Sequence, residues 1–364
     1  MSQKDSADVA RLSTADLAAG IDAFDVVIDV RSPAEFALDH IPGSINCPVL
    51  DNEERILIGT LYKQESPFAA KKRGAALVAK NIAQHLETHF LEMPREWRPL
   101  IYCWRGGERS GAFTHILRRI GWKASQLEGG YQGFRRQVIA DLAQAAEAFS
   151  FRVICGMTGS GKTRVLHELA AVGEQVLDLE CLANHRGSVL GGDPIDPQPT
   201  QKAFETRIWN ALRQLDPSRA VFVESESKKV GGVHIPDALM ERIRLGECIE
   251  VRASNSTRVS WLMREYHHFL SNTADLEDKL GMLRARYGNE AISVWCEQAQ
   301  AGRFAELVED LLVKHYDPSY QGSIRRNFLR YDSADSFMLD GDSDAAFLTI
   351  AKAIKAKYSS KKRG

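Results

Sequence analysis

The strongest constraint on the fold is a glycine-rich motif that stands between an apolar run and a helical pattern. Residues Gly156–Thr163 have the sequence GMTGSGKT, which fits G-x-x-x-x-G-K-[ST]. Phe151–Cys155 before the motif is typical of a buried strand, and Arg164–Ala170 after it has the spacing of a helix. Strand, glycine turn and helix together predict an α/β unit that holds phosphate at the start of the helix.

A second loop has the same surroundings but carries a cysteine. Cys103 follows the apolar run Pro99–Tyr102 and precedes the helical pattern Ala112–Ile120. Backbone N–H groups and the positive end of a helix dipole favour a thiolate at such a position, and Arg105 and Arg109 add positive charge. We therefore predict a nucleophilic Cys103 beside an anion site formed with the two arginines. A buried structural cysteine is the alternative interpretation.

The glycine-rich motif predicts a diphosphate site. Its glycines allow backbone N–H groups to surround the anion, its lysine neutralises charge, and its threonine hydroxyl can reach a metal ion. The motif indicates phosphate without identifying the molecule that carries it. The expected diphosphate-binding residues are Gly156, Thr158, Gly159, Ser160, Gly161, Lys162 and Thr163.

Acidic residues at two later strand ends are candidates for a metal or substrate site. Glu224 and Glu226 close the apolar run that begins at Val221, and Asp178 follows a short run that ends at Leu177. Acidic groups near a phosphate loop commonly hold a metal ion, and the carboxyl ends of strands meet at one crevice in open α/β sheets. An exposed strand end without a ligand is the alternative for the glutamates.

Four further residues are candidates for substrate contacts. His185 and Arg186 lie in the polar loop Asn184–Ser188 after a predicted strand, and Lys228 and Lys229 precede a glycine pair. Polar glycine-containing loops after strands line substrate pockets in α/β proteins, and paired lysines contact anions. Solvated surface residues are an equally good interpretation.

Composition limits the class of protein. The 364 residues carry a formal net charge of −1, so a polynucleotide partner would be held by local basic patches. The six cysteines are far apart and include no Cys-x-x-Cys pair, so we expect no zinc site. The first residues have no signal-peptide pattern and no apolar run has membrane-spanning length, so we expect a cytoplasmic protein without a membrane partner.

Length and pattern predict two α/β domains, residues 1–148 and residues 149–364. In the first, the run Val26–Val30 is typical of a buried strand, and Ser32 and Glu35 have the spacing of a helix capping box. Further helices are expected over residues 69–89 and 134–149. The second domain includes a largely helical region from Trp261 to about His315.

The first domain resembles the rhodanese family. Residues 26–48 and the glycine motif Leu127–Tyr131 carry that resemblance, which implies a rhodanese-like fold with Cys103 as the carrier of a transferable sulfur. It also implies that Asp29 and Arg31 are structural supports. The matching positions in residues 26–48 are Asp29, Arg31, Glu35, His40, Ile41, Pro42, Gly43, Asn46 and Pro48.

The whole chain resembles the tRNA 2-selenouridine synthase family. A rhodanese-like domain followed by a P-loop NTPase-like domain with a helical extension is an uncommon pairing, and the resemblance includes residues 184–188 and 221–232. It implies a transferase that converts tRNA wobble 2-thiouridine to 2-selenouridine with selenophosphate. It also implies S-geranylation of the 2-thiouridine from geranyl diphosphate.

The resemblance assigns a role to each candidate site. Cys103 would hold selenium while Arg105 and Arg109 steer selenophosphate, and the glycine-rich motif would hold the diphosphate of geranyl diphosphate with Mg²⁺ as a candidate cofactor. The four substrate-contact candidates would face tRNA or another substrate. The expected partners are tRNA and an enzyme that supplies selenophosphate.

Two other functions use the same residues. A P-loop kinase or ATPase fused to a sulfurtransferase domain would bind a nucleotide at Lys162. A Cys-x5-Arg phosphatase domain would use Cys103 to attack phosphorus, although Tyr102 stands where such enzymes usually have histidine.

Overall fold

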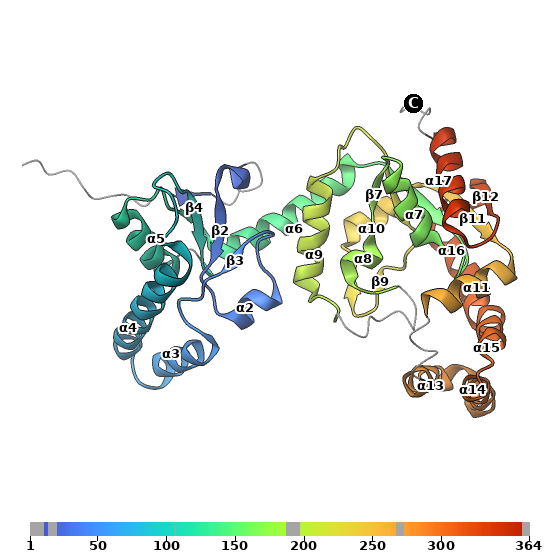
Figure 1. Ribbon diagram of the computed structural model, residues 1–364, viewed down its shortest axis with the longest axis horizontal. Helices are drawn as coiled ribbons and strands as arrows, with labels where there is room; N and C mark the ends of the chain where they lie inside the picture. Colours follow the sequence, from blue (N-terminus) through green and yellow to red (C-terminus); the bar gives the residue numbers. More distant parts are fainter. Residues whose placement is uncertain (1–10, 14–19, 106, 187–196, 267–272, 359–364) are drawn as a thin grey trace, which may run out of the picture. The chain divides into compact units, whose positions relative to one another are not determined.

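The computed structural model describes residues 11–13, 20–105, 107–186, 197–266 and 273–358, and the chain divides into two compact units (Figure 1). Unit 1 comprises Met1–Asp141 and Thr200–Asn210, and unit 2 comprises Leu142–Pro199 and Ala211–Gly364. Each unit contains a five-stranded parallel sheet, which confirms the predicted α/β class. Where the sequence predicts one division between residues 148 and 149, the structure also assigns Thr200–Asn210 to unit 1.

The strands of unit 1 lie in the order β1-β5-β4-β2-β3. Their bounds are β1 Arg11–Leu12, β2 Val26–Asp29, β3 Ile45–Asn46, β4 Pro99–Tyr102 and β5 Ser125–Leu127. The helices are η1 Ile21–Ala23, α2 Pro33–Leu38, α3 Asn52–Gln64, α4 Pro67–His85, η2 Leu86–Phe90, α5 Glu108–Ile120 and α6 Gly130–Ala148, together with most of α9 Gln201–Arg213.

Local sequence signals explain where several of these helices begin. Ser32 caps α2, and its N–H donates to Glu35 Oε2 at 3.2 Å, which completes the predicted capping box. Asp51 and Glu54 form the same reciprocal box at the start of α3, a helix that the sequence analysis did not anticipate. The helix expected from residue 69 is α4, which ends at His85 before a π-helical turn, and α6 begins four residues before the expected Phe134.

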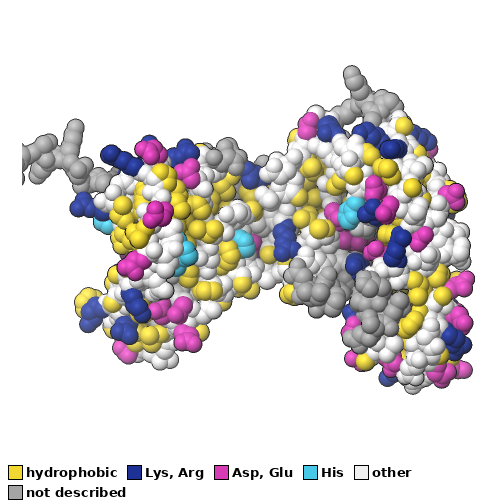
Figure 2. Space-filling model, viewed as in Figure 1, with side chains coloured by type: hydrophobic (Ala, Val, Ile, Leu, Met, Phe, Trp, Pro, Cys, Tyr) yellow, Lys and Arg dark blue, Asp and Glu magenta, His cyan; other side chains and the backbone are white. Residues whose placement is uncertain are grey.

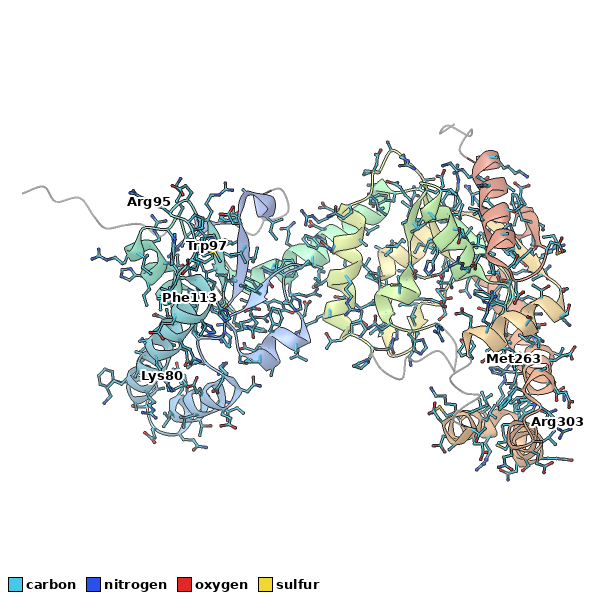
Figure 3. The ribbon with its side chains drawn as sticks, viewed as in Figure 1. Lys80, Arg95, Trp97, Phe113, Met263 and Arg303 are labelled. Atoms are coloured by element: carbon cyan, nitrogen blue, oxygen red, sulfur yellow. The ribbon has the colours of Figure 1, made fainter. Side chains whose placement is uncertain are left out.

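The core of unit 1 lies between the sheet and the helices α4 and α5. Ile28 and Ile101 from β2 and β4 are fully buried there against Phe113 of α5 and Trp97. Figure 3 labels Trp97 and Phe113 within this core. Burial of side chains of this size contributes about 1.5–3 kcal/mol each, so the packing of α4 and α5 holds β4 and the loop after it in place.

The strands of unit 2 lie in the order β12-β11-β6-β8-β7, and β9 and β10 form a separate antiparallel pair. The strand bounds are β6 Phe151–Cys155, β7 Gln175–Leu177, β8 Val221–Glu224, β9 Lys229–Val230, β10 Val233–His234, β11 Glu247–Ala253 and β12 Asp335–Leu339. The helices are α7 Lys162–Ala171, α8 Leu179–Ala183, α10 Asp237–Arg244, α11 Asn255–Glu265, α13 Thr273–Gly281, α14 Arg284–Gln300, α15 Phe304–Leu311, η3 Leu312–Tyr316, α16 Asp317–Asn327, η4 Tyr331–Ser333 and α17 Asp344–Tyr358.

Chain order places both candidate loops at switch points of their sheets. In unit 2 the strands β8 and β7 lie on one side of β6, and β11 and β12 lie on the other side. The glycine-rich motif follows β6. In unit 1 the strand β4 lies between β2 and β5, and Cys103 follows β4. Ligands of open α/β sheets bind at such points, outside the carboxyl ends of the strands.

The described residues of unit 2 include two apolar cores. Leu166 of α7 and Phe347 and Ile354 of α17 pack on the sheet, while Leu280, Trp295 and their neighbours form a separate core among α13, α14 and α15. These helices fall within the predicted helical region. On the face drawn in Figure 2, Lys and Arg side chains are interspersed with Asp and Glu side chains in each unit. Among the described residues, no helix combines the length and the apolar character that a membrane span requires.

Candidate active sites

Cys103 lies directly after β4, in front of α5. Its side chain is 4 % exposed, and the Ser110 hydroxyl of α5 donates to Sγ at 3.2 Å. Gln126 of β5 donates to Ser110 Oγ at 2.7 Å, which holds the hydroxyl in place. The sulfur therefore has a hydroxyl partner in the first turn of a helix, but Cys103 also belongs to the buried apolar core of unit 1. This environment is closer to the alternative of a buried cysteine than to the predicted cradle for an anion. Gly106 of the loop lies outside the described residues.

The two arginines of the loop are already bonded to other side chains. Arg109 Nη1 donates to Glu35 Oε2 at 2.9 Å, and Arg105 Nε donates to Gln132 Oε1 at 3.1 Å. Burial opposes the ionisation of Glu35, yet the Arg109 guanidinium holds the pKa of this carboxyl below its usual value. An anion beside Cys103 would therefore compete with Glu35 for Arg109. Because Glu35 neutralises the guanidinium, the loop offers less net positive charge to an anion than its two arginines indicate.

A buried ion pair between Asp29 and Arg31 supports the loop that contains Cys103. Arg31 Nη2 lies 2.6 Å from Asp29 Oδ2, both side chains are almost fully buried, and the Arg31 guanidinium lies 3.9 Å from the ring centroid of Tyr131. The N–H of Tyr131 donates to the carbonyl of Cys103 at 2.9 Å. Asp29 and Arg31 are thus bonded to each other beneath the loop, in the supporting arrangement that the sequence predicts.

The α9 segment of unit 1 joins the same polar network. Thr206 Oγ1 donates to Asp39 Oδ2 at 3.1 Å, and Tyr131 donates to the same carboxylate oxygen at 2.8 Å. Arg135 of α6 donates to Thr206 Oγ1 at 3.0 Å and forms an ion pair with Glu205. A segment that follows the phosphate loop by about forty residues in the sequence therefore completes the support of the Cys103 loop.

The glycine-rich motif forms a compact loop around its own lysine. Lys162 Nζ donates to the carbonyl of Gly156 at 2.8 Å, across the position that a phosphate group takes in such loops. Gly161 has φ +71°, and a Cβ atom there would clash with the Phe347 ring. A side chain at Gly156 would lie 2.5 Å from the carbonyl oxygen of Val251. Both glycines are therefore required by the fold of the loop as well as by access of an anion.

Three glutamates gather beside Lys162 and Thr163. Thr163 Oγ1 donates to Glu180 Oε2 at 3.0 Å, and burial together with nearby Glu226 raises the pKa of Glu180 to about 8. Glu224 is fully buried, and neither of its carboxylate oxygens has a hydrogen-bond partner. Burial and the neighbouring acids raise the pKa values of Glu224 and Glu226. Unpartnered buried carboxylate oxygens beside a threonine hydroxyl are the donors that Mg²⁺ prefers.

Asp178, the third acidic candidate, has other partners. Its Oδ1 accepts from the N–H of Cys181 as the N-cap of α8, and its Oδ2 lies 2.6 Å from His167 Nε2. The hydrogen bond to Asp178 raises the pKa of His167. The structure thus brings Glu224 and Glu226 together with Glu180. Asp178 has a capping role and lies close enough to interact electrostatically with all three glutamates. Among the described residues, no group of three or more His, Cys, Asp or Glu side chains has an arrangement that could hold a metal ion.

The four substrate-contact candidates are dispersed. Arg186 lines the cavity beside the motif, where its guanidinium lies 5.3 Å from the ring centroid of Tyr266. His185 is half-buried, and Lys228 pairs with Asp237 on the surface. Lys229 is exposed on β9. Within the described chain, Arg186 is the one member of this group that lines the cavity.

A cavity of about 750 Å³ opens above the motif. Its floor includes Gly159, Lys162 and Thr163, and its walls include the helices α11 and α16. Arg258 of α11 fixes these walls, because its Nε donates to the carbonyl of Thr158 at 2.8 Å and its guanidinium pairs with Asp317 of α16. The cavity therefore combines an anion-binding floor with walls that carry aromatic and aliphatic side chains.

Three residues of this site escaped the sequence analysis. Glu180 lies at the start of α8, and Arg258 lies in α11. Tyr320 lies in α16, and its hydroxyl oxygen accepts a hydrogen bond of 2.7 Å from the N–H of Gly156. None belongs to a recognisable motif, and two are about a hundred residues or more from the loop that they contact. The one available signal was that acidic residues follow β7. That signal indicated Asp178, the N-cap of α8, as readily as Glu180, the second residue of the same helix.

Comparison with known proteins identifies both units. Residues 13–137 match the model of the rhodanese-like domain, and residues 149–284 match the model of the tRNA 2-selenouridine synthase AAA domain. The chain is 38 % identical over 346 residues to a tRNA 2-selenouridine synthase of Nitrosomonas europaea, covering 82 % of this chain and 89 % of that protein. It is 31 % identical over 334 residues to the same enzyme of a Sulfurovum species, covering 84 % and 90 %.

Among solved structures, the chain is similar to the N-terminal domain of a putative ATP/GTP binding protein from Clostridium difficile 630. The identity is 31 %, the TM-score is 0.31, and the match covers 36 % of this chain and 98 % of that one. A rhodanese-related protein from Thermoplasma volcanium matches at 23 % identity with a TM-score of 0.24, covering 35 % of this chain and 92 % of that one. At these scores neither likeness supports a conclusion about function.

Proposed function

Since the chain belongs to the tRNA 2-selenouridine synthase family, we propose that it is a tRNA-modifying transferase that converts wobble 2-thiouridine to 2-selenouridine in the cytoplasm. The finer proposal has two steps, S-geranylation from geranyl diphosphate and replacement of the geranylated sulfur by selenium from selenophosphate. One observation supports it: the chain combines a cysteine loop in unit 1 with a phosphate loop in unit 2, and the cavity at the phosphate loop has aromatic and aliphatic side chains in its walls.

The first step uses the phosphate loop. The sulfur of 2-thiouridine attacks the first carbon of the geranyl chain, the carbon–oxygen bond breaks, and the diphosphate leaves with the bonding electrons. The base then releases its N3 proton. Lys162 and the N–H groups of the loop stabilise the charge on the leaving diphosphate, because donors held in place before the reaction need no reorganisation. This role explains a phosphate loop without requiring ATP.

A divalent cation would be held beside this loop by protein groups together with the bound diphosphate, because the described acidic side chains by themselves have no arrangement that could hold a metal ion. The unpartnered oxygens of buried Glu224 and the hydroxyl of Thr163 are the groups that would hold Mg²⁺. When bound, the ion would supply positive charge for the diphosphate. Glu180 and Glu226 would remain close enough to adjust the charge of the site, since both interact electrostatically with Lys162.

The second step uses Cys103. Attack of its thiolate on the selenium of selenophosphate forms a sulfur–selenium bond and breaks the selenium–phosphorus bond. The bonding electron pair stays on phosphorus, which accepts a proton and leaves as phosphite. A thiol reductant then supplies two electrons to release selenide, which displaces geranylthiol at C2 of the base. Ser110 donates to Sγ and stabilises the thiolate. Because Cys103 is 4 % exposed, side chains that cover Sγ must move before selenophosphate can reach it.

Two partners follow from this chemistry. The substrate is tRNA whose wobble base leaves its stack, since a base cannot reach an enclosed site while stacked. A selenophosphate-supplying enzyme is the second partner, and Arg105, Arg109 and Arg186 are the candidate contacts with anionic substrates.

Incubation of the protein with 2-thiouridine tRNA, geranyl diphosphate, selenophosphate, Mg²⁺ and dithiothreitol tests the proposal. Mass spectrometry of the digested nucleosides should detect S-geranyl-2-thiouridine and 2-selenouridine. Cys103→Ala should abolish selenouridine and retain geranylation, whereas Lys162→Ala should reduce geranylation at least tenfold. Cys296→Ala, in a helix apart from both loops, and Lys352→Ala are the matched controls.

The same reaction mixture separates the rival functions. Rapid release of ADP from added ATP, without any modified nucleoside, would support a kinase or ATPase. Release of phosphate from a phosphotyrosine peptide that depends on Cys103 would support a phosphatase. Either result without 2-selenouridine would overturn the proposed function.

A further inference from the structure

One wall of the cavity above the phosphate loop carries no charge. The face of α16 contributes Tyr316, Ser319, Tyr320, Ser323, Ile324 and Asn327, and Phe328 follows at the end of the helix. These positions recur at intervals of three and four residues, so they form one continuous helix face. The charged residues of the cavity come from the phosphate loop, from α7 and α11, and from segments near α8, β8 and α17.

Tyr320 marks the phosphate end of this wall. Its hydroxyl accepts from the N–H of Gly156 at 2.7 Å, and Lys162 Nζ lies 5.7 Å from its ring centroid. The Tyr320 ring therefore lies beside the position of a diphosphate that Lys162 holds. Beyond Tyr320, towards the end of α16, the largest lining side chains are Ile324 and Phe328, each 3 % exposed.

The length of this wall matches a short isoprenoid. An α-helix advances 1.5 Å per residue, so the step from Tyr320 to Phe328 spans about 12 Å. The main chain of a geranyl group extends about 9 Å at carbon–carbon bonds of about 1.5 Å. A geranyl chain that starts at Tyr320 thus ends beside Phe328, and a farnesyl chain, longer by one isoprene unit, meets the Phe328 ring.

We propose that the α16 face from Tyr320 to Phe328 binds the prenyl chain and that Phe328 selects its length. The inference rests on the proposed geranylation and adds the residues that determine its specificity. Transfer of the isoprenoid chain from water to this wall favours binding in proportion to the apolar area buried. A chain longer than the wall forces displacement of a closely packed ring.

Competition between allylic diphosphates tests the proposal. The full-length protein and 2-thiouridine tRNA are incubated with equal concentrations of dimethylallyl, geranyl and farnesyl diphosphate, and the prenylated nucleosides are quantified by mass spectrometry. Phe328→Ala should raise the ratio of farnesyl to geranyl product at least tenfold, and Phe328→Leu should raise it by a smaller factor. Ser323→Phe, which fills the wall about 4.5 Å beyond Tyr320, should reduce geranyl transfer at least tenfold and should reduce dimethylallyl transfer by a smaller factor.

Leu329→Ala is the matched control, because Leu329 is 73 % exposed beside Phe328 and should leave every ratio unchanged. If the unchanged protein prenylates tRNA but no variant alters the ratios, the assignment of the wall is wrong while the proposed function stands. If the unchanged protein transfers none of the three groups, both the proposed function and this inference fail. Should Phe328→Ala not fold, Phe328→Leu and Ser323→Phe decide the question.

Discussion

The glutamate cluster beside the phosphate loop predicts an unusual dependence of stability on pH. Burial and nearby Glu226 raise the pKa of Glu180 to about 8, whereas an unfolded glutamate titrates near 4.3. Between these values the unfolded chain binds fewer protons than the folded one. The free energy of unfolding should therefore fall as pH rises, by roughly 3 kcal/mol from pH 5 to pH 7 for this group.

Glu180→Gln isolates this contribution. Glutamine retains an oxygen that accepts from Thr163 Oγ1 but does not ionise. Urea unfolding at pH 5, 6, 7 and 8 in the presence of a chelator should show a smaller decline for the variant than for the unchanged protein. The variant must be compared with the unchanged protein because the raised pKa of His167 also makes the free energy of unfolding fall as pH rises. Parallel profiles for the two proteins would refute the argument, and Mg²⁺ with pyrophosphate should flatten the profile of the unchanged protein.

Three further predictions concern the supports of the two loops. Arg258→Met removes a buried partner of an aspartate on α16 and a bond to the phosphate loop, so it should cost about 3 kcal/mol or more in urea unfolding, and a loss below 1 kcal/mol would contradict the assignment. Gly161→Ala places a methyl group against the Phe347 ring, at a backbone position whose φ is +71°. Calorimetry should therefore show a lower melting temperature, and pyrophosphate should bind more weakly. Unchanged values of both would count against the loop geometry. A fragment of residues 1–148 lacks the α9 segment 200–210, so it should unfold at lower urea than the same fragment with that segment fused, and equal midpoints would argue against its place in unit 1.

Local patterns in the sequence predicted the strands and helices on either side of the two candidate loops. The apolar runs before Cys103 and Gly156 are strands β4 and β6, and the helices after both loops are α5 and α7. The spacing of Ser32, Pro33 and Glu35 indicated the start of α2. These features depend on neighbours in the sequence, which is why periodicity and capping rules identify them.

The surroundings of the loops depend on distant residues and were not predictable from one sequence. Arg258 contacts Thr158 across a hundred positions, and Tyr320 contacts Gly156 across a still longer interval. The near burial of Cys103 and the pairing of Arg109 with Glu35 also arise from the tertiary fold. A loop motif identifies which chemical groups a loop contains. Whether those groups are exposed, and whether their charge is neutralised by a partner, depends on the residues that pack against the loop.

We propose that Cys103 carries selenium to tRNA, and intact-protein mass spectrometry after exposure to selenophosphate tests this role most directly. The protein should gain the mass of one selenium atom at Cys103 and lose it to a thiol reductant, and Cys103→Ala should gain nothing. Formation of 2-selenouridine by Cys103→Ala, or by a protein that never acquires selenium, would contradict it.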